Sequence, residues 1–213
     1  MKKKYLCISA FLLVSFIIWT LLISFVDVKA IGPEGSSVGL ATLNGAFHTL
    51  TGTHMWLYTV TDWLGLVPIV FCLGFAIFGL AQWIKRKSLL KVDLSILALG
   101  GFYLLVMATY ILFEYAVINY RPVLIYGYLE ASYPSSTTML VMCVMPTSIM
   151  QLRDRIASTV LNKCVTYIIV AFILFMVVGR LISGVHWITD IIGGALVSSG
   201  LVLMYYGLAH AKK

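Results

Sequence analysis

The chain has 213 residues, of which 61% are hydrophobic and only 11% are charged, and its mean hydropathy is +1.00. Soluble domains are about 45–50% apolar and about 25% charged, so this composition excludes a water-soluble globular protein. Since a spanning helix needs about 20 apolar residues, the length allows about six spans with short loops and no separate soluble domain. We therefore expect one all-α, membrane-embedded domain over residues 1–213.

Apolar runs along the chain predict the positions of these spans. The runs are Tyr5–Val26, Leu64–Trp83, Leu94–Ala116, Thr138–Met150, Val165–Ile182 and Ile191–Ala209. The fourth run is short, and we expect its helix to extend to about Leu152. The first run has the basic start of a signal peptide, but it is longer than the roughly 7–15 apolar residues of a usual signal core. We therefore interpret it as a span that is retained.

The longest connection between spans is Ile31–Asp62. It begins with the loop-forming run Gly32–Ser37. The segment Leu43–Val60 then mixes apolar with polar residues and contains Trp56 and Tyr58. Since Trp and Tyr favour the membrane surface, we predict a helix that lies at the interface.

Basic residues are concentrated in alternate connections. With a cytoplasmic N-terminus, the outer segments contain only Lys29, Arg121 and Arg180 of the 15 Lys and Arg residues. The other basic residues are Lys2, Lys3, Lys4, Lys85, Arg86, Lys87, Lys91, Arg153, Arg155, Lys163, Lys212 and Lys213. The positive-inside rule then predicts an even number of spans with both termini cytoplasmic. The net charge of +7 is therefore a topology signal, and it does not indicate nucleic acid as a partner.

The cysteines give no sign of a disulfide framework or a metal site. Cys7, Cys72, Cys143 and Cys164 lie in or beside apolar runs, and the sequence contains no CxxC motif. We expect them to be small packing residues, and we predict no metal and no cofactor. Gly193-Gly194, in the last span, predicts close packing of that helix against a neighbour.

Three polar segments are predicted to lie on the outer side of the membrane. They are Glu114–Pro122, Tyr133–Thr138 and Gly179–Asp190. Ionisable residues at membrane depth are costly and usually functional. The topology is deduced from the charge distribution alone, and it places all three segments on the same side of the membrane. This agreement favours a single site.

The residue types in these segments suit a phosphate group. Arg121 and Arg180 carry guanidinium forks that match phosphate oxygens. Ser135 and Ser136 follow a proline at a predicted helix start, where hydroxyls and free backbone N–H groups can bind an anion. The sequence therefore predicts an anion site built from these four residues.

His186 and Asp190 add a possible nucleophile. They are four residues apart, so on a helix they share one face, and Asp190 can orient and charge-stabilise the imidazole. A histidine held in this way can attack phosphorus. The alternative interpretation of the pair is a structural hydrogen bond.

These motifs resemble the type 2 phosphatidic acid phosphatase family, which are membrane relatives of the vanadium haloperoxidases. The family pattern is KxxxxxxRP, then PSGH, then SRxxxxxHxxxD. The chain matches it at Arg121-Pro122, at Pro134-Ser135 and at the full spacing of Arg180, His186 and Asp190. The last spacing is the specific part of the resemblance.

The resemblance implies a metal-independent phosphatase that acts on lipid phosphates at the outer leaflet. By this resemblance His186 attacks phosphorus and forms a phosphohistidine, while Asp190 orients it. Arg121, Arg180 and Ser135 would hold the phosphate. The implied partners are a membrane lipid substrate and the bilayer itself.

Four positions depart from the family pattern. Glu114 stands at the lysine position, Thr137 at the histidine of PSGH, Ser136 at its glycine and Gly179 at the serine of the third motif. The family histidine would protonate the leaving oxygen, and losing such an acid costs about 10²–10⁴-fold in rate. A phosphomonoester that leaves from a diphosphate is a weak base and needs little protonation, so the substitution favours a lipid diphosphate, such as a polyprenyl diphosphate, over phosphatidic acid.

The roles of the two main substitutions stay open at this point. Glu114 could replace the missing acid, since desolvation can raise the pKa of a carboxyl group, or it could be a structural or ion-pairing residue. Thr137 also suits the N-terminal turn of a helix.

Two classes of function remain. The first is a lipid phosphate or diphosphate phosphatase, which His186 and Asp190 favour because mere binding needs no nucleophile. The second is a catalytically impaired relative that binds or moves a phosphorylated lipid, which Glu114 and Thr137 favour. The compact loops and the basic N-terminus favour a multi-pass protein of a bacterial cytoplasmic membrane, with the site facing outward.

Overall fold

The computed structural model describes residues 2–209, and every regular element within that range is a helix, as the sequence predicts. The two C-terminal lysines used for the predicted orientation lie outside this range. Two short 3₁₀ turns, Pro33–Gly35 and Leu89–Lys91, lie in connections. The α-helices are α1 (Lys2–Phe25), α2 (Ala41–Thr51), α3 (Met55–Leu64), α4 (Leu66–Arg86), α5 (Leu94–Tyr115), α6 (Ser136–Arg153), α7 (Thr159–Ile182) and α8 (Ile188–Ala209).

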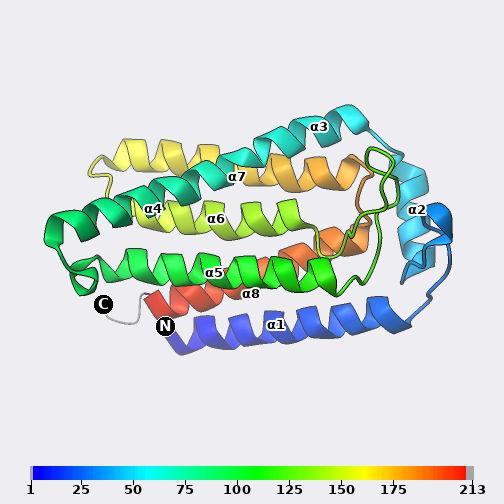
Figure 1. Ribbon diagram of the computed structural model, residues 1–213, viewed down its shortest axis with the longest axis horizontal. Helices are drawn as coiled ribbons and strands as arrows, with labels where there is room; N and C mark the ends of the chain where they lie inside the picture. Colours follow the sequence, from blue (N-terminus) through cyan, green and yellow to red (C-terminus); the bar gives the residue numbers. More distant parts are fainter. Residues whose placement is uncertain (1, 210–213) are drawn as a thin grey trace.

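The long helices α1, α4, α5, α6, α7 and α8 run side by side in one bundle, as Figure 1 shows. Five of the described helical segments are long and apolar enough to cross a membrane. They are Lys3–Phe25, Met55–Arg86, Leu94–Tyr115, Thr159–Ile182 and Ile188–Ala209. The chain is therefore a multi-pass membrane protein with an all-α fold.

Helix α6 corresponds to the predicted fourth span, but its hydropathy is too low for it to be among the five. The reason is its position, since α6 packs against α4, α5, α7 and α8. Its polar residues Thr147, Ser148 and Gln151 are buried among these helices. Gln151 donates a hydrogen bond from Nε2 to the hydroxyl of Tyr205 on α8, at 2.8 Å. Protein surrounds this helix, so it needs less apolar surface than its neighbours.

The connection over residues 31–62 differs from its prediction. The expected helix over Leu43–Val60 is divided into α2 and α3, because α2 ends at Gly52, whose φ of +67° favours glycine. Helix α3 then continues in line into α4 (Figure 1), since Gly65 between them keeps helical φ and ψ. The second apolar helical segment therefore begins at Met55, nine residues before the predicted start at Leu64.

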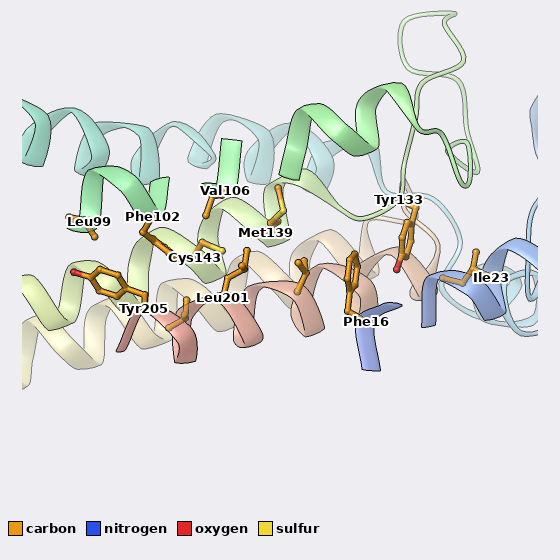
Figure 2. Packing of buried hydrophobic residues seen from close by; sticks show 12 residues of the cluster. Phe16, Ile23, Leu99, Phe102, Val106, Tyr133, Met139, Cys143, Leu201 and Tyr205 are labelled. Atoms are coloured by element: carbon orange, nitrogen blue, oxygen red, sulfur yellow. The ribbon is translucent and has the colours of Figure 1, made fainter. Parts of the chain in front are cut away.

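Residues of α1, α5, α6 and α8 form the main apolar cluster, in which α1 packs closely against α8 (Figure 2). The ring of Tyr133, from the segment before α6, stacks against Phe16 of α1 at 6.1 Å between centroids. Its hydroxyl lies 2.7 Å from Oγ1 of Thr20. A Cβ at Gly193 would come within 2.4 Å of the Tyr133 ring, so this glycine permits the close approach that the sequence predicts. Tyr133 is thereby fixed, and with it the start of α6.

The two connections at one end of the bundle contact each other directly. The backbone N–H of His54, between α2 and α3, donates to the carbonyl of Ser183, between α7 and α8, at 2.8 Å. Nε2 of His48 lies 3.1 Å from the carbonyl oxygen of Gly184. Gly184 has a φ of +67°, and a Cβ on it would lie 1.9 Å from the carbonyl oxygen of Gly52. This position therefore requires glycine both for its positive φ and for the absence of a Cβ.

We predict that Gly184→Ala destabilises the protein more than Gly35→Ala does. Both positions have positive φ, at +67° and +72°, but Gly35 has no heavy atom within 4 Å of an added Cβ. Each substitution adds about 1–2 kcal/mol of left-handed strain, and Gly184→Ala adds a further overpacking cost of about 1–3 kcal/mol. The measurement is the thermal unfolding midpoint of each variant in detergent. Equal midpoints for the two variants would contradict the packing argument.

Candidate functional site

The three polar segments meet at one end of the bundle. The α5–α6 connection, the start of α6 and the α7–α8 connection all lie at the right-hand end in Figure 1, beside α2 and the beginning of α3. The backbone N–H of Ser135 donates to the carbonyl of Asp190 at 3.1 Å, which joins the second segment to the third. Nε1 of Trp187 donates to the carbonyl of Tyr120 at 2.7 Å, which joins the third to the first. The predicted convergence of the segments is therefore confirmed.

Ser135 is the N-cap of α6. Its buried Oγ accepts a hydrogen bond from the backbone N–H of Thr138 at 3.4 Å. Thr137 lies in the first turn of the helix, as predicted. This helix terminus carries a partial positive charge and free N–H groups, so it suits an anion.

His186 and Asp190 face each other and are both buried. His186 lies just before α8, and Asp190 lies in its first turn. Oδ2 of Asp190 accepts a hydrogen bond from the backbone N–H of Trp187 at 2.9 Å and lies 3.7 Å from Nδ1 of His186. The carboxylate is thus held by the backbone, slightly beyond hydrogen-bonding distance of the imidazole that it faces.

Arg121 contacts the opposite side of the imidazole. Its Nη1 lies 3.3 Å from Nε2 of His186, and since a guanidinium only donates, Nε2 is the acceptor. The remaining proton of a neutral imidazole then lies on Nδ1, towards Asp190. Nε of Arg121 pairs with Oε2 of Glu130 at 3.0 Å, and its backbone N–H donates to the carbonyl of Glu130 at the same distance.

Arg180 is deeply buried, with a side chain only 2% exposed. Its Nη2 donates to Oδ1 of Asp62 at 2.8 Å and to Oγ1 of Thr137 at 2.7 Å. The ring of Tyr58 lies 4.8 Å from Cζ of Arg180 and 5.9 Å from Cζ of Arg121. One aromatic face therefore supports both guanidinium groups.

Burial and charge together keep His186 neutral. Loss of solvent around the imidazole lowers its pKa well below the ordinary value, and the positive charges of Arg121 and Arg180 lower it further. A neutral imidazole has a free electron pair on Nε2, which is what a nucleophile or a proton acceptor requires.

The arginine donors suit an oxyanion. Nε and Nη1 of Arg180 are buried, and neither has a hydrogen-bond acceptor with suitable geometry within residues 2–209. Buried donors are nearly always satisfied, so these atoms indicate a ligand with several acceptor oxygens. Together with the start of α6 and the buried His186, they make a site with the chemistry to bind a phosphate group and react with it.

Most of the predicted site residues come together here. Arg180 contacts Thr137, Arg121 contacts His186, and Ser135 is bonded to Asp190 through the backbone. Two other predicted residues, Ser136 and Glu114, line a small hollow beside this cluster, together with Ser132 and Pro134.

Glu114 is not the ion-pair partner of either arginine. It lies exposed at the end of α5, next to Tyr110, and among residues 2–209 it makes no hydrogen bond or ion pair with Arg121, Arg180 or His186. The carboxylates that pair with the arginines are Asp62 and Glu130. Sequence reasoning did not place them in the site, and neither did it place Tyr58. The sequence contains only a weak signal for Asp62, which follows the aromatic Tyr58 by four positions at the edge of an apolar run.

No group of three His, Cys, Asp or Glu side chains converges as metal ligands would in the described part of the chain. The polar atoms of the site are instead mainly cationic donors, which match an anion.

Comparisons with known proteins agree with this geometry. The sequence model of the PAP2 superfamily matches residues 97–213. A crystal structure of a transmembrane PAP2 type phosphatidylglycerolphosphate phosphatase from Bacillus subtilis is similar, with a TM-score of 0.64 over 96% of this chain and 97% of that one. Its sequence identity of 20% establishes a shared fold only. No curated protein sequence matches the chain significantly. Because the family model covers more than half of the sequence, the chain belongs to the PAP2 superfamily.

Proposed function

We propose that this PAP2-type membrane phosphatase removes a phosphate from a lipid phosphate or diphosphate through a phosphohistidine at His186. The observation that carries the proposal is the buried imidazole of His186, 3.3 Å from Arg121 and facing Asp190, in a site where two buried guanidinium donors of Arg180 have no acceptor. A binding protein needs the donors, but it has no need of a nucleophile held in one tautomer.

The first step follows from this geometry. Phosphate oxygens accept hydrogen bonds from Arg121 and Arg180, which neutralises charge and brings phosphorus to Nε2 of His186. The Nε2 electron pair forms a bond to phosphorus while the bond to the leaving oxygen breaks, and that oxygen keeps the electron pair. Asp190 stabilises the positive charge that develops on the imidazole. The product is a phosphohistidine.

Thr137 supports a lipid diphosphate, with polyprenyl diphosphate as the favoured substrate. Its hydroxyl accepts from Arg180, so it helps to fix the phosphate-binding arginine, but an alcohol is too weak an acid to protonate a leaving alkoxide. The phosphomonoester that leaves from a diphosphate is a much weaker base. The role of Glu114 as a replacement acid stays a prediction, and its place beside Ser136 keeps it near the start of α6.

We further propose that the site faces outward from a bacterial cytoplasmic membrane. The α4–α5 and α6–α7 connections, which contain Lys85–Lys91 and Arg153–Lys163, lie at the end of the bundle opposite the site (Figure 1). The positive-inside rule assigns such an end to the cytoplasm. The site then meets lipid phosphates of the outer leaflet, in keeping with a role in the cell envelope.

We predict that the purified protein releases phosphate from polyprenyl diphosphate in the presence of EDTA, and that His186→Ala reduces the rate by about 10³-fold or more. His54→Ala is the matched control, because the side chain of this exposed histidine has one hydrogen-bond partner among the described residues, the carbonyl of Thr51. The measurement is inorganic phosphate released in detergent. Absence of release by folded wild-type protein would favour the alternative function, a catalytically impaired relative that binds or moves a phosphorylated lipid.

We predict that polyprenyl diphosphate is cleaved faster than phosphatidic acid, and that Thr137→His raises the rate with phosphatidic acid by about 10²-fold relative to the diphosphate. The reason is that a histidine can protonate the alkoxide of a phosphomonoester, a step that the diphosphate scarcely needs. The measurement is kcat/KM for both lipids in both proteins. Faster cleavage of phosphatidic acid by the wild type would remove the leaving-group argument.

We predict that the acidic limb of the kcat/KM profile lies below pH 6.5, the ordinary pKa of histidine. The neutral imidazole is the active form, so activity is lost only when pH falls through the lowered pKa of His186. Arg121→Gln removes one of the charges that lower this pKa, so the limb moves to higher pH. The same substrate is used for both proteins, so its own ionisation cancels in the comparison. If the acidic limb lies at the same pH in Arg121→Gln as in the wild type, it does not reflect the ionisation of His186.

A further inference from the structure

Asp62 lies beside the position at which the chain departs most from its family. Its Oδ1 and the Oγ1 of Thr137 accept hydrogen bonds from the same atom, Nη2 of Arg180, at 2.8 and 2.7 Å. The two oxygens are therefore neighbours. Thr137 occupies the place of the PSGH histidine. A carboxylate from α3 thus stands next to the point where the family places its proton-transferring side chain.

A phosphohistidine must be hydrolysed before the enzyme can turn over again. The attacking water approaches in line with the bond to His186, on the face from which the leaving group has departed. An acid that protonates the leaving group also lies on this face, and by microscopic reversibility it is then the base that deprotonates the water. The hydroxyl of Thr137 cannot act as that base, so another group must accept the proton.

The geometry points to Asp62 as this base, an inference that rests on the proposed function. The other two carboxylates of the site have different partners. Asp190 faces His186 and accepts a hydrogen bond from the backbone of Trp187. Glu130 is paired with Arg121, which contacts His186. Asp62 differs in being next to Thr137 and in having a side chain that is 57% exposed.

The fold holds Asp62 in this place. Tyr58, one turn earlier on α3, packs its ring against the Arg180 guanidinium. Thr61 contacts α7 so closely that a Cβ on Gly179 would lie 2.8 Å from its Cγ2. These two contacts hold α3 against α7 and place the carboxylate beside Arg180.

A water oxygen forms a bond to phosphorus as the bond between phosphorus and Nε2 of His186 breaks, and the electron pair of that bond returns to Nε2. One proton of the water passes to the Asp62 carboxylate. Hydrogen phosphate leaves, His186 is again neutral, and Asp62 releases its proton to the solvent.

The test separates the two half-reactions with polyprenyl diphosphate labelled in its terminal phosphate. In Asp62→Asn we expect the phosphohistidine to form in the first turnover and to accumulate, while steady-state turnover falls by about 10²-fold or more. Asp62→Glu retains a carboxylate and should turn over without accumulation. Rapid acid-free quenching followed by detection of base-stable, acid-labile label on the protein measures the intermediate.

Glu130→Gln is the matched control, since it removes the carboxylate from the other arginine. We expect it to change KM without accumulation of phosphohistidine. If Asp62→Asn slows formation of the phosphohistidine as much as its hydrolysis, or if both variants accumulate it equally, the inference is overturned and Asp62 merely positions Arg180.

The wild type distinguishes this inference from the proposed function. Wild-type protein that forms no phosphohistidine and releases no phosphate overturns both together. Wild-type protein that turns over, beside an Asp62→Asn variant with no accumulated intermediate, overturns only the role of Asp62.

Discussion

The arrangement of the site depends on one buried charge, the guanidinium of Arg180, in a bundle that is otherwise largely apolar. A buried cation without partners is strongly destabilising, so the groups around it must be fixed. Asp62 of α3 and Thr137 of α6 each accept one of its hydrogen bonds, and the ring of Tyr58 covers its face. Satisfying this charge joins α3, α6 and α7, and it sets the start of α6 beside the phosphate-binding atoms.

The position of His186 depends on a second constraint, which is close backbone packing. His186 reaches Arg121 only because the α7–α8 connection turns sharply at Gly184, against the carbonyl of Gly52. The connection between α2 and α3 thereby supports the loop that carries the imidazole. Polar site residues at the end of an apolar bundle are thus held by backbone contacts and by ion pairs, two kinds of interaction that do not depend on apolar burial.

Some of this could be predicted from sequence because the relevant contacts are local. Arg180, His186 and Asp190 lie within eleven residues of one another, in the last turn of α7, the short connection and the first turn of α8, so their proximity is largely a property of the local chain. The pairing of Arg180 with Asp62 spans 118 positions and arises from the packing of α3 against α7, which hydropathy does not encode. Hydropathy also predicts too short a fourth span, because α6 is covered by protein and therefore carries buried polar residues that interrupt its apolar run.

The threonine at position 137 and the carboxylate of Asp62 can be explained together, through the proton transfers of the proposed reaction. A phosphohistidine enzyme transfers two protons, one to the leaving oxygen and one from the attacking water, and a histidine can serve both steps in turn. Asp62 lies next to Thr137 and is more than half exposed, a position that suits the second of these steps. A diphosphate substrate removes the need for the first donor, because its leaving group is a weak base. Once the substrate supplies a good leaving group, the only proton transfer that the protein must still provide is the one for which Asp62 is suited.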